Sequence, residues 1–141
     1  MEDRIIQKYV KDLSGLLNEI RTSEAKSPLR ETEVDELMYE NSVIFAFGRL
    51  FKYFNFSEIH FGTPKNALDA VAVLNGQAIT IEFEPTSIGF LEHLKKNALT
   101  PQQYKTTLIV CWKHDSNKIP SEIDVLELKK LWELAKATTT K

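Results

Sequence analysis

The dipeptide Asn75-Gly76 is the feature that most constrains how this chain folds. It lies within the stretch ALDAVAVLNGQAITIEFE, residues 67–84, between two runs of small and β-branched apolar residues. Both residues tolerate the positive φ angles that a two-residue type I′ turn needs, so the pair is a strong signal for a β-hairpin. Such a turn also fixes the register, because Leu74 must face Gln77 and the ladder continues outward from there.

The same register brings carboxylates together. Asp69 faces Glu82 across the two strands, and Glu84 lies two residues further along on the face of Glu82. Opposed like charges destabilise a sheet unless they are neutralised. A hard divalent cation such as Mg²⁺ would do so; a nearby Lys or Arg, or protonation of one carboxyl, would also serve. In the remaining alternative, the acidic residues lie on a solvated face of the hairpin, or a β-bulge breaks the predicted register. The neighbours on that face, Val71 and Val73, are apolar, which favours a localised site.

Composition narrows the class of protein. The chain has 141 residues, of which 43% are hydrophobic and 27% charged, as expected of an ordinary globular protein. Its net charge of −2 argues against avid non-specific binding to nucleic acid. No apolar run is long enough to cross a bilayer, and the N-terminus lacks the apolar core of a signal peptide, so we expect a cytoplasmic protein without membrane contact.

Two further absences in the sequence exclude other site types. The single cysteine, Cys111, can form neither an internal disulfide nor a thiolate metal site alone, and its setting in LIVCW indicates a buried strand residue. No glycine-rich phosphate loop occurs, so no nucleotide cofactor is expected.

The chain is expected to consist of an N-terminal helical segment, 1–24, and a main α/β domain, 28–137. Apolar residues recur at helical spacing through residues 2–21 and predict an amphipathic helix. Ile6, Leu13 and Ile20 also fall one heptad apart. Two interpretations stay open: a helix packed on its own domain, or a dimerisation arm.

A second helix is predicted from about residue 33 to residue 54. Its apolar face includes Leu37 and Ile44, and Glu40 lies between them on the same face by the i+3/i+4 rule. A carboxylate on a core-facing stripe is unusual. The phenylalanines of this region are expected to form an aromatic core: Phe45, Phe47, Phe51, Phe54 and Phe56.

The remaining chain predicts an α/β fold. Short strands and a helix alternate, and a hairpin joined to a buried strand through a crossover helix implies a mixed central sheet flanked by helices. Pro85 is expected to end the third strand, and Ser87 to cap the next helix. The segment 121–128 is either a last strand, at 123–128, or the start of one continuous helix. The expected strands are 58–62, 68–74, 77–84 and 106–112, and the expected helices are 87–98 and 129–137.

This order of elements, with ALDA on one strand and IEFE on the next, resembles the PD-(D/E)XK nuclease superfamily over about residues 33–128. The resemblance implies a restriction-endonuclease-like fold with an α-β-β-β-α-β core, here with an extra N-terminal helix. GFLEHLKK followed by LIVCWKHD is similar to Holliday-resolvase-like or uncharacterised members. Two positions depart from the motif: the proline before Asp69 is missing, and Glu84 stands where the family has lysine. Lys95 and Lys96, beside His93, are the obvious substitutes and the expected nucleic-acid contacts.

The resemblance implies a divalent-metal-dependent DNA endonuclease. Asp69 and Glu82 would bind Mg²⁺ or Mn²⁺, with the carbonyl of residue 83 as a further ligand, and the metal would lower the pKa of a bound water. Glu84 would either position that water or extend the site, and Glu40 would hold a metal-bound water. His93 would contact phosphate or act as a general acid; alternatively it is a solvated helix residue. A homodimer is expected, because cleavage of a duplex needs two sites.

Two other interpretations stay open. In one, the chain is a catalytically inactive nuclease-fold protein that binds DNA or a protein partner, as the missing lysine and the acidic net charge favour. In the other, the resemblance is accidental and the chain is an α/β interaction module. Metal affinity at Asp69 and Glu82 separates the active nuclease from the inactive one.

Overall fold

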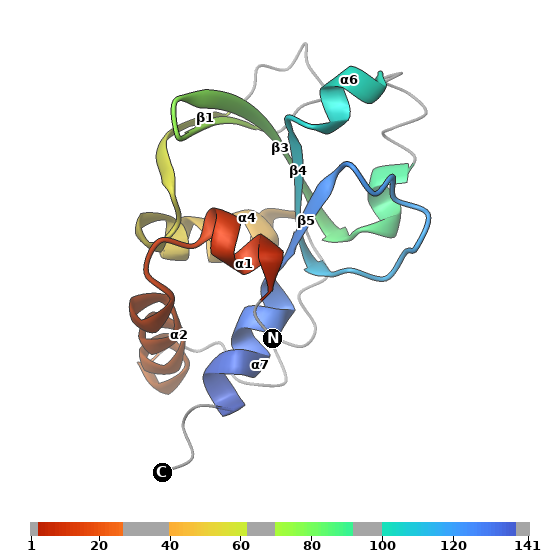
Figure 1. Ribbon diagram of the computed structural model, residues 1–141. Helices are drawn as coiled ribbons and strands as arrows, with labels where there is room; N and C mark the ends of the chain where they lie inside the picture. Colours follow the sequence, from red (N-terminus) through yellow and green to blue (C-terminus); the bar gives the residue numbers. More distant parts are fainter. Residues whose placement is uncertain (1–2, 27–39, 62–69, 92–99, 138–141) are drawn as a thin grey trace.

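The structure is a computed structural model that describes residues 3–26, 40–61, 70–91 and 100–137. It is an α/β fold built on an open, mixed five-stranded sheet with the strand order β1-β2-β3-β4-β5 (Figure 1). The elements are α1 (Arg4–Tyr9), α2 (Leu13–Lys26), α4 (Glu40–Leu50), the 3₁₀ turn η1 (Phe51–Tyr53), β1 (Phe56–Phe61), β2 (Ala70–Leu74), β3 (Gln77–Thr86), α6 (Pro101–Tyr104), β4 (Thr107–Lys113), β5 (Asp124–Glu127) and α7 (Leu128–Ala137).

The β2–β3 hairpin has the predicted register. Leu74 pairs with Gln77, and the described ladder runs from there to the pair of Ala70 with Ile81. The turn residues have positive φ angles, 52° at Asn75 and 83° at Gly76. The dipeptide therefore does what its sequence predicts, and it fixes which residues of β3 face each side of the sheet.

Strands β3, β4 and β5 are parallel to one another, whereas β1 and β2 are antiparallel to their neighbours. The prediction that Pro85 ends the third strand is wrong, because β3 continues to Thr86. The backbone N–H of Thr80 donates to the carbonyl oxygen of Thr106, just before β4. By strand alternation, the backbone N–H and C=O groups of the even-numbered residues of β3 therefore point toward β4. Pro85 falls on the other side, beyond the described pairing with β2, where its missing N–H breaks no bond of that ladder.

The main core lies on one face of the sheet, under α2, α4 and α7. Its aromatic centre is Phe47, whose ring lies 5.1 Å from that of Phe54 and 5.4 Å from that of Phe83, measured between centroids. Phe56 is also buried there, as predicted, and Phe51 is partly buried. The expectation for Phe45 is wrong: it is 58% exposed and lies under the guanidinium of Arg49 on the outer side of α4.

The N-terminal segment forms two helices and not one. Val10 forms a bridge with Phe54, and Asp12 then starts α2 by accepting a hydrogen bond from the N–H of Gly15 at 2.9 Å. Both helices bury apolar side chains in the main core, among them Tyr9, Leu16 and Ile20, although Leu13 of α2 is exposed. Packing on its own domain is therefore the interpretation that the structure supports for this segment.

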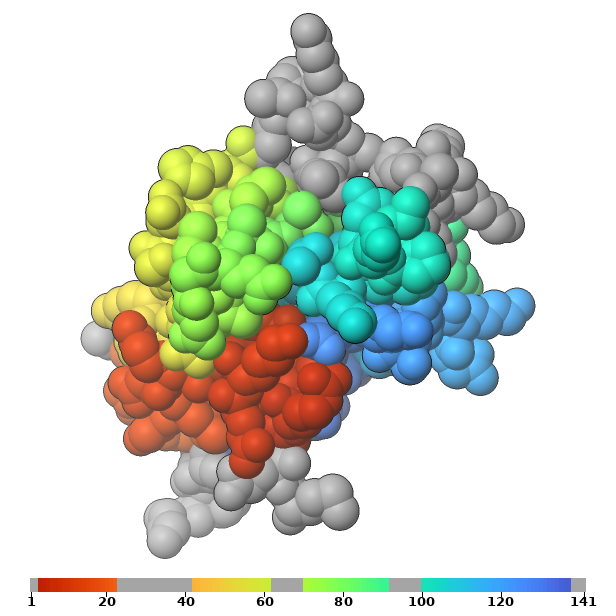
Figure 2. Space-filling model, turned by 45° about the horizontal axis from the view of Figure 1, so that its top comes forward, coloured from red at the N-terminus to blue at the C-terminus, as the bar shows by residue number. Residues whose placement is uncertain are grey.

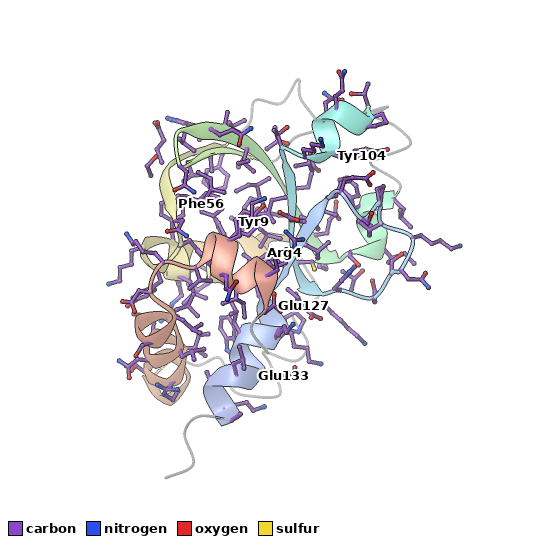
Figure 3. The ribbon with its side chains drawn as sticks, viewed as in Figure 1. Arg4, Tyr9, Phe56, Tyr104, Glu127 and Glu133 are labelled. Carbon is purple, nitrogen blue, oxygen red and sulfur yellow. The ribbon has the colours of Figure 1, made fainter. Side chains whose placement is uncertain are left out.

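A buried carboxylate ties α1 to β5, and Figure 3 labels two of its partners, Arg4 and Tyr9. Asp124 is 6% exposed and accepts hydrogen bonds from Arg4 at 2.9 Å, Lys8 at 2.9 Å and the Tyr9 hydroxyl at 2.6 Å. Burial by itself raises the pKa of Asp124, but the hydrogen bonds from Tyr9, Lys8 and Arg4 outweigh it and hold the pKa below its usual range. We call this group the Asp124 cluster.

The opposite face of the sheet carries a smaller apolar cluster, made of Phe90, Ile109, Cys111 and Ile123. Of the two alternatives for residues 121–128, the structure has the strand: β5 is followed directly by α7. The short helix α6 was not predicted. In the described ranges, no helix is long and apolar enough to cross a membrane.

Candidate acidic site on the central strand

Glu82 and Glu84 are the buried carboxylates of the central strand. Their exposed fractions are 1% and 5%. Ile81 and Phe83 alternate with them and point into the main core. The two glutamates therefore point to the opposite face of the sheet, the face of the smaller cluster, and they share it as the sequence predicted.

A row of side chains crosses the three parallel strands at this level. Glu84 of β3 is in register with Cys111 of β4, which is in register with Glu127 of β5. Burial raises the pKa of the Cys111 thiol, and the negative charges of Glu127, Asp115 and Glu84 raise it further. The thiol is thus kept protonated and serves as a small apolar spacer inside an acidic row. Figure 3 labels Glu127, next to the start of α7.

Gly89 makes room for the Glu84 carboxylate. A Cβ atom at position 89 would lie 2.8 Å from Oε1 of Glu84, closer than real Cβ contacts allow. A side chain there would therefore displace the carboxylate. The helical turn 88–91 is positioned so that its glycine faces this carboxylate.

Ser87 fastens the loop after β4 to the end of β3. Its buried hydroxyl oxygen accepts hydrogen bonds from the backbone N–H of Asp115 at 3.0 Å and of Ser116 at 3.2 Å. It also lies 2.7 Å from Nδ1 of His114. Asp115 in turn accepts from the N–H of Ile88 at 3.1 Å. A hydroxyl that is fully buried and held by two N–H donors is a structural lock, and it is unsuited to act as a nucleophile.

His114 also lies at this edge, and the sequence analysis did not single it out. It is exposed, and its backbone N–H donates to Oε2 of Glu127 at 2.9 Å. With Ser87 at Nδ1, the ring is held on one side while its Nε2 edge is turned away from that contact. Its place directly after a buried parallel strand was the available signal, since sites in α/β sheets gather at the carboxyl ends of such strands.

Several predicted site residues lie outside the described residues: Asp69, His93, Lys95 and Lys96. Glu40 begins α4, but its side chain is likewise not described. The described ladder stops at Ala70 with Ile81, one step before the predicted pair of Asp69 with Glu82. Within the described part of the chain, no three His, Cys, Asp or Glu side chains form a group that could hold a metal. The metal pair therefore stays a prediction.

Comparison of this chain with protein-family models, curated proteins and solved structures found no match.

Proposed function

We propose that this chain is a nuclease-like protein that hydrolyses phosphodiester bonds in DNA with Mg²⁺ or Mn²⁺ at the acidic face of β3. The observation that carries the proposal is the pair Glu82 and Glu84, which are buried on one face of the central strand. Buried carboxylates cluster at functional sites, where their environment is arranged for chemistry, and this supports the proposal.

The donor set suits a hard cation. Glu82 offers carboxylate oxygens, and Asp69 is predicted directly opposite it across the hairpin. Two carboxylates with several waters are the usual protein share of a magnesium site. Such an ion, when bound, would supply charge stabilisation at the phosphate and lower the pKa of a water.

The chain's own residues would accept the proton and contact the phosphate. Glu84 takes the place that the motif gives to lysine, so it would accept a proton from the attacking water and would not neutralise phosphate. The absence of a side chain at Gly89 leaves room for the Glu84 carboxylate. His114, held by Ser87, would offer its outer ring nitrogen to the phosphate or the leaving oxygen. Lys95 and Lys96 are the proposed contacts to the DNA backbone.

A second function also has support. Glu84 at the lysine position and the net charge of −2 favour a nuclease-fold protein that has lost catalysis and binds DNA or a protein. In that case the acidic face is retained as a structural remnant, and metal affinity there would be weak.

Cleavage of plasmid and branched DNA with Mn²⁺ or Mg²⁺ tests the proposal. Asp69→Asn and Glu82→Gln should each reduce cutting at least a hundredfold, whereas Glu122→Gln, a charge change at an exposed residue, should leave it unchanged. Absence of cutting by the folded wild-type protein with either metal would refute the enzyme and leave the binding module.

A further inference from the structure

Strand β1 lies at one edge of the sheet. Among the described residues it pairs with β2 alone, so its outer edge has no strand beside it (Figure 1). In Figure 2 the yellow atoms, which belong to the segment that ends at residue 61, form one outer side of the molecule. They lie beside the green atoms of the β2–β3 hairpin. The unpaired N–H and C=O groups of an edge strand are a template for a further strand.

The devices that usually protect an edge are weak here. A bulge interrupts the pairing between Phe56 and Glu58, but Glu58–Phe61 then pair regularly with β2. No lysine or proline occurs in FSEIHF, and the strand exposes an aromatic ring, since Phe61 is 58% exposed and stacks on buried Phe83 with centroids 6.2 Å apart. Among the residues that the structure describes, the edge is therefore open to pairing from Glu58 onward.

The polar side chains of this strand complement each other as hydrogen-bond donor and acceptor. Glu58 and His60 are two residues apart, so they share one face, and their side chains are 56% and 72% exposed. The Glu58 carboxylate lies 2.7 Å from Nε2 of His60. An imidazole can donate to a carboxylate whether it is neutral or protonated.

We propose that β1 pairs antiparallel with β1 of a second copy of this chain, about a two-fold axis at Ile59. In that register Glu58 lies opposite His60 of the second copy, and His60 lies opposite its Glu58. Ile59 faces Ile59, and Phe61 faces Ser57 while reaching diagonally over Ile59 of the second copy. The two sheets then join into one.

The charges select this register over its neighbours. A two-fold axis at Glu58 would place two carboxylates opposite each other, and an axis at His60 would place two imidazoles opposite each other. Either register loses both contacts between Glu58 of one copy and His60 of the other. Complementarity of a strand with itself is the property of an isologous interface, so a second copy fits this edge better than an unrelated peptide does.

Sedimentation velocity over a range of protein concentrations tests the proposal. The wild type should dimerise as concentration rises. His60→Glu should weaken dimerisation about tenfold or more, because it opposes carboxylates at both pairs. The double variant Glu58→Lys with His60→Glu should restore the dimer, because the introduced ammonium group of each copy would face the introduced carboxylate of the other.

Gln102→Glu adds one negative charge at an exposed position of α6 and serves as the matched control, with dimerisation unchanged. Circular dichroism of every variant establishes that the fold is retained. A wild type that is monomeric at every concentration would overturn the proposal. So would a dimer that His60→Glu leaves intact, or a folded double variant that stays monomeric.

Discussion

Replacing Asp124 by Asn should destabilise the protein strongly. The carboxylate is 6% exposed and accepts hydrogen bonds from Arg4, Lys8 and Tyr9, of which Arg4 and Lys8 can only donate. An asparagine amide would turn its NH₂ group toward at least one of them. The bond from the buried Tyr9 hydroxyl to a charged acceptor contributes about 1.5–3 kcal/mol. Arg4 and Lys8 are 68% and 40% exposed, so each adds less than about 1 kcal/mol.

The expected loss for Asp124→Asn is therefore about 3 kcal/mol of unfolding free energy. Urea unfolding monitored by circular dichroism measures it, and a melting temperature lower by roughly 10 °C should accompany it. Arg4→Gln, which removes the most exposed partner, is the control and should cost less than about 1 kcal/mol. A loss below about 1 kcal/mol for Asp124→Asn would refute the reasoning that this cluster anchors α1.

The same cluster sets a pH dependence. Because the folded-state pKa of Asp124 is lowered, its stabilisation is fully present above the unfolded value of about 3.9 and is lost as pH falls through the folded value. The stability difference between wild type and Asp124→Asn should therefore shrink below about pH 4. A difference that stays constant down to about pH 2 would contradict the assigned protonation.

Three further predictions concern single positions. The Cys111 thiol, buried and with a raised pKa, should not react with a thiol reagent in the native protein and should react fully in urea; fast native labelling would contradict its placement. Gly89→Ala should impair cleavage or metal binding, because the new methyl group would displace the Glu84 carboxylate. The control Gly48→Ala, in α4 with open space around it, should leave cleavage and metal binding unchanged and should stabilise the protein by up to about 1 kcal/mol. Equal effects of the two variants on cleavage or metal binding would argue against a role for the space at Gly89. Gly76→Ala should lower the unfolding free energy by about 1–2 kcal/mol because of the positive φ there, and a neutral result in urea unfolding would count against the turn geometry.

The hairpin was the most predictable part of the fold. A two-residue Asn-Gly turn leaves one register, so the pairing of β2 with β3 and the shared face of Glu82 and Glu84 followed from the sequence. The buried strand β4 followed from its continuous apolar run. These features are local, which is why periodicity and turn chemistry were enough.

Other features depended on tertiary contacts that no local pattern reveals. The break between α1 and α2 comes from backbone bonds of Lys11 and Asp12 to the carbonyl of Tyr53, far along the chain. Pro85 stays within β3 because its missing N–H faces away from β4. Helical spacing alone did not show that Phe45 faces solvent.

The site was only partly predictable. Glu82 and Glu84 emerged from strand alternation, but Ser87 and His114 are 27 residues apart and meet only because β3 and β4 are parallel neighbours. The importance of a glycine at position 89 follows only from its contact with the Glu84 carboxylate in the folded chain. Spacing within a single segment does not contain such contacts, so they were outside the reach of motif analysis.

Binding of Mn²⁺ to the purified protein, measured by calorimetry beside Glu82→Gln, tests the central claim most directly. The proposal predicts a saturable site in the wild type whose affinity falls at least tenfold in Glu82→Gln, with Glu122→Gln unchanged. A folded wild-type protein that binds no Mn²⁺, or binds it equally well with Gln at position 82, would contradict a metal site on the central strand.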